Sequence, residues 1–311
     1  MSVETVQTKI DAERAPAGDT FEGFVIALGT YLLWGVLPLY LKLVAHLPTL
    51  EVVAHRILWS VPIAFVVLML MRRLDDYWAA LKSPRMVRNA AFAAAIITVN
   101  WGTYVWAIAA GQAVEAALGY YINPLMTVLI GAVFFRDRMT RMQMIAIGLA
   151  VAAVAILTWE SGGLPWVSLS LAGSWCAYAV LKKTLPIGPA QGFLLEVTLL
   201  AVPALAYVVW VEASGAGHLS DRGGVDALLL AGCGVVTAVP LILYATAAKK
   251  LTLSTIGLMQ YIAPTMVFLI AVFVFREPFS STKLFAFTLI WAGLVLYTIS
   301  ALRGRANARR A

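Results

Sequence analysis

Long apolar runs separated by short polar segments dominate this sequence. Each run is about 20 residues long, which is the length that an α-helix needs to cross the hydrocarbon core of a bilayer. The runs lack the alternation of apolar and polar residues that marks a half-buried strand. The pattern predicts an all-α integral membrane protein with ten transmembrane helices, at residues 24–43, 50–71, 87–110, 113–135, 141–159, 165–183, 191–211, 226–248, 254–275 and 282–302.

The segments between and beyond these runs are short. The third and fourth runs nearly touch, so we expect a tight turn at Gly111-Gln112. Residues 1–23 are polar, mixed in charge and without the basic-then-apolar start of a signal peptide, which predicts a flexible cytoplasmic tail. Residues 303–311 are expected to form a second, basic tail, and residues 72–88 a basic cytoplasmic loop.

The composition agrees with a membrane protein. Of 311 residues, 61% are hydrophobic and 13% are charged, whereas soluble domains are about 45–50% apolar and about 25% charged. This excludes a soluble enzyme, a disordered regulator and a collagen-like fibre. The net charge of +7 would suit nucleic acid, but the charges flank apolar runs rather than forming a polar domain. The expected partners are therefore the lipid bilayer and a small solute, with no nucleic acid.

The positions of Lys and Arg predict the orientation of the helices. With the N-terminus inside, 18 of these residues fall in internal segments and three, Arg222, Arg276 and Lys283, fall outside. Positively charged loops stay in the cytoplasm. Both termini are therefore expected to be cytoplasmic, which requires an even number of spans.

The two halves of the chain repeat one another. Residues 118–137 and 258–277 align without gaps at an offset of 140, and a one-residue shift aligns parts of the preceding spans. We expect repeats at 24–159 and 165–302, each with five spans, and the odd number inverts the second repeat relative to the first. Inverted repeats are typical of transporters that open a central cavity alternately to either side. The aligned pairs include Trp34/Trp175, Tyr104/Tyr244, Tyr121/Tyr261, Pro124/Pro264, Arg136/Arg276 and Asp137/Glu277.

Several motifs resemble a known family. The repeated module ending in Phe135-Arg136-Asp137 and Phe275-Arg276-Glu277 resembles the EamA module of the drug/metabolite transporter superfamily. More narrowly, the chain is similar to the RarD-like group. The resemblance implies a bacterial inner-membrane permease with a 5+5 fold, a cavity lined by spans 1–4 and 6–9, and spans 5 and 10 outside it, where a homo-oligomer could form. The motifs of the narrower group are Tyr31-Leu-Leu-Trp-Gly-Val-Leu-Pro-Leu-Tyr40, Glu51-Val-Val-Ala-His-Arg-Ile-Leu-Trp-Ser60, Asn100-Trp101 and Gly119-Tyr-Tyr-Ile-Asn-Pro124.

The second predicted span contains a charged residue, Arg56. Charges at this depth are costly, so they face a cavity or a partner. The planar guanidinium suits a carboxylate or phosphate, which predicts that Arg56 binds an anionic substrate. The alternative is an ion pair with Glu115 or Glu51 that holds helices together.

Three further residues are candidates for proton coupling or gating. Histidine is the side chain whose ordinary pKa lies near neutral pH, so His55 is a candidate to carry a coupling proton; the alternative is a pair with Glu51 one turn away. Glu196 aligns with His55 in the second repeat and could carry a proton, or be neutralised by Lys182 or Lys183. Glu115 is either an external gate residue or a first-turn acid that favours the helix dipole.

Polar and aromatic residues in the middle of the spans are the other candidates for substrate binding. An amide in hydrocarbon needs a hydrogen-bond partner, aromatic rings can stack on a planar ligand, and the prolines at 124 and 264 are expected to kink their helices at matching positions. The alternative for each residue is core packing. The candidates are Trp34, Asn100, Tyr104, Tyr120, Tyr121, Asn123, Trp175, Gln260 and Tyr261.

Motifs for other chemistry are missing from the sequence. It contains no phosphate-binding G-x-x-x-x-G-K-[ST] loop and no H-E-x-x-H or paired-cysteine metal spacing. Cys176 and Cys233 lie in apolar runs and are expected in the core. We therefore predict no catalytic residue, no metal and no cofactor, and the protein is not expected to be an enzyme.

The function predicted from these observations is secondary transport. The protein is expected to export small organic metabolites or drugs, driven by a substrate gradient or by proton exchange through His55 or Glu196. The alternatives are an importer or facilitator of amino-acid-like or aromatic solutes, a sensor or scaffold without transport, and a membrane enzyme that acts on lipids.

Overall fold

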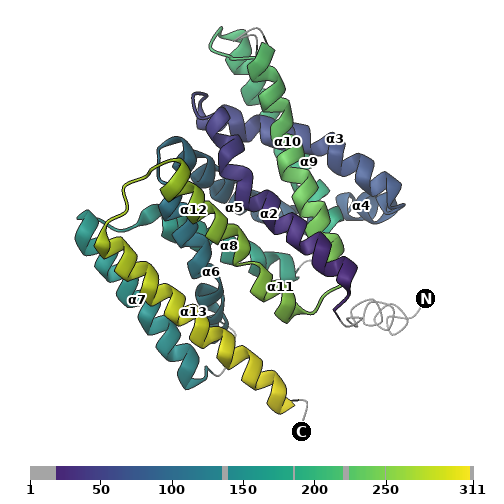
Figure 1. Cartoon of the computed structure of the whole chain (residues 1–311). Coiled ribbons are helices and arrows are strands. Elements are labelled where there is room, and N and C mark those ends of the chain that lie inside the picture. The colour runs from purple at the N-terminus through teal and green to yellow at the C-terminus, as the bar shows by residue number, and fades with distance from the viewer. Residues whose placement is uncertain (1–18, 135–138, 185, 220–223, 249, 309–311) are drawn as a thin grey trace.

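The computed structural model describes residues 19–134, 139–184, 186–219, 224–248 and 250–308, and these residues form helices and turns but no strand (Figure 1). The expected all-α architecture is thus confirmed. The helices are α2 (Phe21–Leu43), α3 (Thr49–Leu70), α4 (Leu74–Leu81), α5 (Pro84–Ala109), α6 (Ala113–Phe134), α7 (Arg141–Ser161), α8 (Trp166–Thr184), α9 (Pro189–Ala213), α10 (Val225–Ala247), α11 (Leu253–Met259), α12 (Ile262–Leu269), the π-helix η2 (Ile270–Val274) and α13 (Ser281–Ala308).

Among the described residues, nine helical stretches are long and apolar enough to cross a membrane. The one predicted span outside this set is 165–183, which is occupied by α8, a helix of 19 residues with several polar side chains. The total of ten spans and their orientation remain predictions.

The helices pack in pairs that come from distant parts of the sequence. α3 lies against α9 and α10, α6 lies against α8 and α12, and α7 lies along α13 at the edge of the molecule (Figure 1). α2 contacts both α10 and α12 and so connects these groups. The contacts therefore join the two halves of the chain throughout the bundle.

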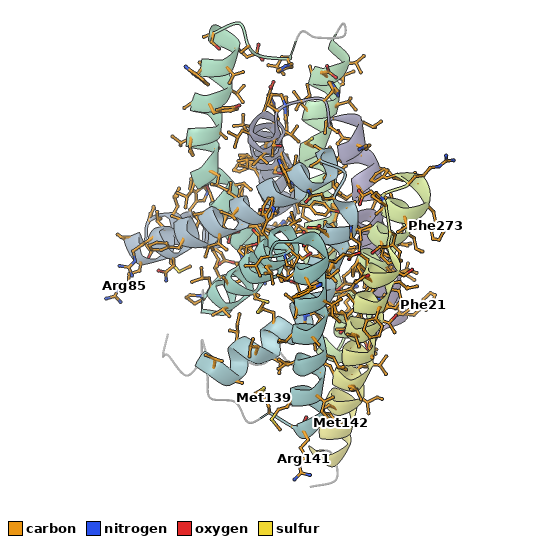
Figure 2. All side chains as sticks on the ribbon, turned by 90° about the vertical axis from the view of Figure 1, so that its left-hand side faces the viewer. Phe21, Arg85, Met139, Arg141, Met142 and Phe273 are labelled. Atoms are coloured by element: carbon orange, nitrogen blue, oxygen red, sulfur yellow. The ribbon has the colours of Figure 1, made fainter. Side chains whose placement is uncertain are left out.

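Large apolar side chains cover much of the outer surface. Phe21 and Phe273 point away from the bundle in Figure 2 and are 83% and 71% exposed. Trp159 is 91% exposed. Apolar patches on this scale are unusual in a soluble monomer, and they suit contact with lipid. Arg85 and Arg141, near the starts of α5 and α7, also point away from the bundle (Figure 2).

Several boundaries differ from the prediction. Residues 72–88 are not a plain loop, because they contain α4 and the start of α5 at Pro84. α4 is too short for a spanning run and has two acidic residues in its first turn, Asp75 and Asp76, so the hydrophobic pattern missed it. At the chain ends, α2 begins at Phe21 and α13 continues to Ala308, within the two predicted tails. The rest of those tails, residues 1–18 and 309–311, lies outside the described residues.

Only one of the two predicted proline kinks appears as a break. α11 ends at Met259, a turn covers Gln260 and Tyr261, and α12 then carries Pro264. Proline cannot donate to the carbonyl four residues earlier, which explains a break at Gln260. In α6 the helix is assigned without a break through Pro124, so the two positions differ in this respect, and the kink at Pro124 stays a prediction.

The turn between α5 and α6 is confirmed. Gly111 has φ +70°, a left-handed conformation that glycine adopts without the steric cost that a side chain would impose. The backbone N–H of Gln112 then donates to the carbonyl of Ala107 at 2.8 Å. This reversal places the start of α6 beside the end of α5.

The starts of α6 and α11 are equivalent positions of the sequence repeat, and each is capped by a carboxylate from a distant part of the chain. Glu277 accepts hydrogen bonds from the backbone N–H groups of Ala113 and Val114, both at 2.8 Å, at the first residues of α6. The equivalent start of α11 is capped by Asp19, which accepts from Thr252 N at 2.7 Å and from the Thr255 hydroxyl at 2.6 Å. These donors lower the pKa of Asp19.

These caps satisfy helix-end donors that would otherwise lack partners. The sequence counterpart of Glu277 is Asp137, and it lies with Phe135 and Arg136 outside the described residues. The described contacts therefore connect the second half of the chain to the start of α6, and the N-terminal segment to the start of α11.

We predict that Glu277→Ala lowers the thermal unfolding midpoint of the purified protein in detergent, because two backbone donors lose their acceptor. Loss of a helix cap costs about 0.5–2 kcal/mol. Glu160→Ala is the matched control, since Glu160 lies near the same end and accepts from Ser280 instead of capping α6. Equal midpoints for Glu277→Ala and the unmodified protein would contradict the capping role.

Candidate binding cavity between the helices

A cavity of about 140 Å³ lies among the packed helices. Among the described residues, α2, α3, α5, α6, α8, α10, α12 and the α11–α12 turn line it, whereas α7, α9 and α13 contribute nothing. α9 occupies the seventh predicted span, so the expectation that this span lines the cavity was wrong. The lining residues are Tyr31, Trp34, Leu37, Arg56, Asn100, Trp101, Tyr104, Tyr120, Asn123, Trp175, Thr237, Leu241, Tyr244, Gln260, Ala263, Pro264 and Val267.

The lining follows the sequence repeat. Five aligned pairs of positions contribute both of their members to the cavity. The repeated residues therefore meet at one place, as expected for a site on the interface between two related halves. The pairs are Trp34/Trp175, Trp101/Leu241, Tyr104/Tyr244, Tyr120/Gln260 and Asn123/Ala263.

Arg56 is the charged residue of this lining. It is only 6% exposed, and its guanidinium carbon lies 4.9 Å from the centre of the Trp101 ring. No described residue accepts a hydrogen bond from its Nε or Nη1 atoms. Neither predicted partner, Glu51 or Glu115, forms an ion pair with it, and within the described lining there is no acidic residue.

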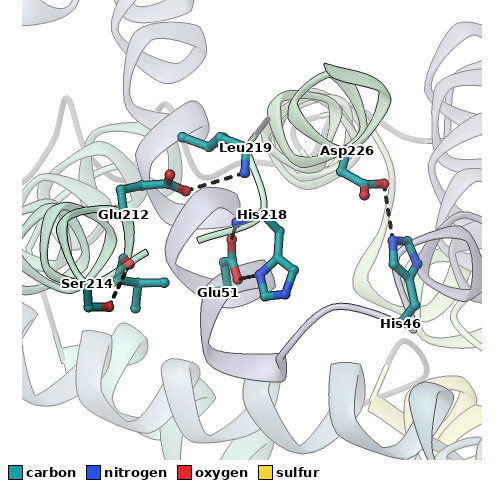
Figure 3. Close-up of polar contacts among 8 residues, drawn as sticks. His46, Glu51, Glu212, Ser214, His218, Leu219 and Asp226 are labelled. Atoms are coloured by element: carbon teal, nitrogen blue, oxygen red, sulfur yellow. Dashed lines mark hydrogen bonds and ion pairs between the residues drawn. The ribbon is translucent and has the colours of Figure 1, made fainter. Parts of the chain in front are cut away.

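Glu51 is bound elsewhere, near the predicted outer end of the bundle (Figure 3). It accepts hydrogen bonds from His218 Nδ1 at 2.6 Å and from His218 N at 3.1 Å, which ties the α9–α10 connection to α3. A second imidazole–carboxylate contact, His46 to Asp226 at 3.1 Å, ties the α2–α3 connection to α10. Both carboxylates are 1% exposed.

His55 does not pair with Glu51, contrary to one of the predicted alternatives. Its side chain is 3% exposed, and within the described part of the chain neither ring nitrogen has a hydrogen-bond partner. It also does not line the cavity. Neighbouring residues on a helix point about 100° apart, so Arg56 faces the cavity and His55 faces the packed interior.

Asn100 holds one wall of the cavity in place. Its Nδ2 donates to the carbonyl of Leu171 at 3.1 Å and to the hydroxyl of Ser174 at 2.9 Å, both on α8. Its Oδ1 accepts from the Tyr120 hydroxyl at 3.4 Å. The amide is therefore used by the protein and orients Tyr120. Asn123 differs, because its Oδ1 is buried without a partner among the described residues.

Aromatic rings form two sides of the cavity. On one side, the Trp34 ring lies 5.7 Å from Tyr31 and 5.6 Å from Tyr244. On the other side, Tyr120 lies 5.5 Å from Tyr104 and 6.5 Å from Trp175. These distances fall in the range of favourable ring contacts.

Two predicted candidates lie away from the cavity. The Tyr121 hydroxyl is 2.7 Å from the Thr265 hydroxyl, and its ring packs against Phe287 and Trp291. Tyr261 is likewise absent from the lining.

The sequence candidates also omitted Tyr31 and Tyr244, both of which line the cavity. The alignment of Tyr244 with Tyr104 was the signal that could have found it.

Glu196 forms an ion pair inside the protein. Its Oε1 lies 2.7 Å from Lys182 Nζ, and its Oε2 accepts from the Tyr178 hydroxyl at 2.8 Å. The carboxylate is thus neutralised by Lys182, as one predicted alternative had it; the Lys183 side chain lies outside the described residues. Glu196 does not line the cavity.

Glu115 lines a second pocket, of about 330 Å³, near the predicted outer end, together with Glu160 and Lys283. It is half-buried, in the first turn of α6. Cys176 and Cys233 are buried free thiols, so their expected place in the core is confirmed. Within the described residues, no cluster of His, Cys, Asp and Glu could hold a metal ion.

Comparisons with known proteins agree on one family. The EamA-like transporter family matches residues 21–159. The chain is 40% identical to "Uncharacterized transporter YojE" of Bacillus subtilis, covering 92% of this chain and 96% of that protein. It is 39% identical to "Protein RarD" of Streptomyces exfoliatus (92% and 91% covered) and 34% identical to "Protein RarD" of Escherichia coli (92% and 97% covered). A crystal structure with 19% identity superposes with a TM-score of 0.55 over 90% of this chain and 98% of its own, which indicates a similar fold.

We predict that Lys182→Met strongly destabilises the protein, because it leaves the Glu196 carboxylate buried without its cation. Breaking a buried pair costs about 3–5 kcal/mol. The double variant Lys182→Met/Glu196→Gln removes both charges and should recover much of the thermal stability in detergent. If the double variant were no more stable than Lys182→Met alone, the loss of the ion pair would not explain the destabilisation of Lys182→Met.

Proposed function

This chain belongs to the EamA-like transporter family, and we propose that it is a secondary permease that exports small organic solutes carrying a carboxylate. It is a multi-pass protein of the bacterial inner membrane, of the drug/metabolite transporter type with RarD-like relatives. The observation that carries the proposal is Arg56, a buried cation on a cavity whose described lining holds no acid. A substrate carboxylate would supply the acceptors that the described residues do not.

The proposed mechanism is alternating access between two inverted five-helix repeats, 24–159 and 165–302, with both termini in the cytoplasm. Three observations support it. Five repeat-related pairs of positions line one cavity, the Lys and Arg residues concentrate on one side of the predicted topology, and matching helix starts are capped by Glu277 and Asp19. Rocking of one repeat against the other would release one cap while the other holds.

For proton coupling, we propose His55 in preference to Glu196. Glu196 is held by Lys182 and Tyr178, whereas the His55 ring is buried without a hydrogen-bond partner among the described residues. Its neighbour Arg56 contacts the cavity, so a change in charge at His55 would be felt at the proposed binding site.

Import or facilitated diffusion would use the same cavity. A membrane enzyme is less well supported, because the described lining contains no histidine or acid that could act as a general base. A sensor without transport would bind the solute but show no flux.

We predict that Arg56→Ala weakens carboxylate binding and uptake at least about tenfold, since hydrogen bonds to charged groups contribute about 1.5–3 kcal/mol and 1.4 kcal/mol corresponds to a factor of ten. The measurement is counterflow in proteoliposomes with aromatic and aliphatic carboxylates, nucleosides and phenicol drugs, together with binding by calorimetry.

The matched control is Lys42→Ala, because Lys42 contacts Phe275 outside the cavity lining. Arg56→Lys keeps the charge but loses the planar fork, and we expect it to be intermediate. Unchanged flux in Arg56→Ala would remove this residue from the site. Binding without flux in the unmodified protein would favour the sensor.

A further inference from the structure

The two repeats do not contribute equally to the cavity. At three aligned positions the first repeat has a polar or large aromatic residue where the second has an aliphatic one: Arg56/Val197, Trp101/Leu241 and Asn123/Ala263. The charged end of the cavity is therefore built by the first repeat alone. Inverted repeats with identical linings would bind a solute equally well in two orientations. The two halves of this lining differ, so the two orientations are not equivalent.

Several residues that α10 and α12 contribute to the lining are apolar. Ala263, Pro264 and Val267 follow one another along one face of α12, and Leu241 on α10 joins them in the lining. α10 also contributes two hydroxyls to the lining, those of Thr237 and Tyr244, and the Thr237 hydroxyl donates to the carbonyl of Cys233 at 2.7 Å. Gln260, at the α11–α12 turn, adds a polar side chain.

The polar wall is held rigidly. Trp101 stacks on the Arg56 guanidinium at 4.9 Å, and Asn100 anchors Tyr120 to α8. Cation–π contact stabilises a buried guanidinium without competing for its N–H donors. Nε and Nη1 of Arg56 are buried and have no acceptor among the described residues.

The volume limits the size of the occupant. A cavity of about 140 Å³ is close to the engineered cavity of about 150 Å³ that binds benzene in another protein. One aromatic ring, or an aliphatic body of similar size, therefore suits this volume.

From these observations we propose that the cavity selects small amphipathic monocarboxylates and binds them in one orientation, with the carboxylate at Arg56 and the apolar body against Leu241, Ala263 and Val267. This rests on the proposed function and deepens it by naming the substrate class and the residues that set its length. Trp101 acts as a positioning residue for the guanidinium. Organic cations are excluded, because no acid of the described lining can neutralise them.

The first test compares probes that share a ring and differ in charge. Phenylacetate, phenylacetamide and 2-phenylethylammonium are titrated against the purified full-length protein by calorimetry, with thermal stability as a second readout. We expect phenylacetate to bind, the amide to bind at least about tenfold more weakly, and the cation not to bind. Equal affinities for the amide and the anion would overturn the proposal that the substrates are monocarboxylates.

The second test locates the apolar body. Val267→Ala enlarges the part of the cavity proposed to hold the apolar body. The affinity for 4-phenylbutyrate, which is two methylenes longer than phenylacetate, should therefore rise at least about fivefold relative to the affinity for phenylacetate. Leu241→Ala enlarges the same wall from α10 and should act in the same direction if Val267→Ala fails to fold. Val272→Ala, on η2 outside the lining, is the matched control and should leave the ratio unchanged.

The two proposals fail in different ways. If Arg56→Ala abolishes phenylacetate binding but neither Val267→Ala nor Leu241→Ala changes the chain-length preference, the single orientation is wrong and the proposed function stands. If phenylacetate binds unchanged in Arg56→Ala, both are wrong. If the wall variants change the preference while Trp101→Ala leaves phenylacetate affinity intact, the positioning role of Trp101 alone is wrong.

Discussion

The buried guanidinium of Arg56, which pairs with no carboxylate of the described residues, is the constraint on which the rest of this structure depends. Placing a charge at such a depth costs about 2.5–3.5 kcal/mol on insertion scales. The protein offsets part of this cost with the Trp101 ring, which faces the Arg56 guanidinium at 4.9 Å. It leaves two nitrogen atoms of Arg56, Nε and Nη1, without an acceptor among the described residues. If Arg56 served only the stability of the fold, an ion pair with a carboxylate would stabilise the protein more than an unpaired guanidinium does.

The buried carboxylates near the cavity explain why Arg56 has no such partner. Glu51 binds His218, Asp226 contacts His46, and Glu196 binds Lys182. Glu277 caps α6. Each of these acids contacts another segment of the chain, and none belongs to the described cavity lining. The cavity is therefore positive and largely aromatic, which is the combination that an amphipathic carboxylate needs.

Much of this arrangement could be predicted from the sequence, since the hydrophobic runs and the Gly111 turn follow from local rules. The side chains that face the cavity were harder to predict, because neighbouring residues on a helix point in different directions. Tyr120 lines the cavity while Tyr121 packs against Phe287, and Arg56 lines it while His55 does not. The apolar pattern of these spans is too uniform to show which face is turned inward.

The partners of the ionisable groups depend on tertiary structure. His218 reaches Glu51 across 167 positions of the sequence, and no local pattern predicts that contact. The short helix α4 was missed because its length and acidic first turn do not resemble a spanning run. Lys182, by contrast, is close enough in sequence to Glu196 that their pairing was among the predicted alternatives.

The most direct test of the central claim is a crystal structure with bound 4-bromophenylacetate, recorded at the bromine absorption edge. The account predicts carboxylate oxygens about 2.7–2.9 Å from the Arg56 guanidinium nitrogens, with the bromine signal beside Val267 and Leu241. A bromine signal in the larger pocket beside Glu115 and Lys283, with Arg56 paired to a protein carboxylate, would contradict it.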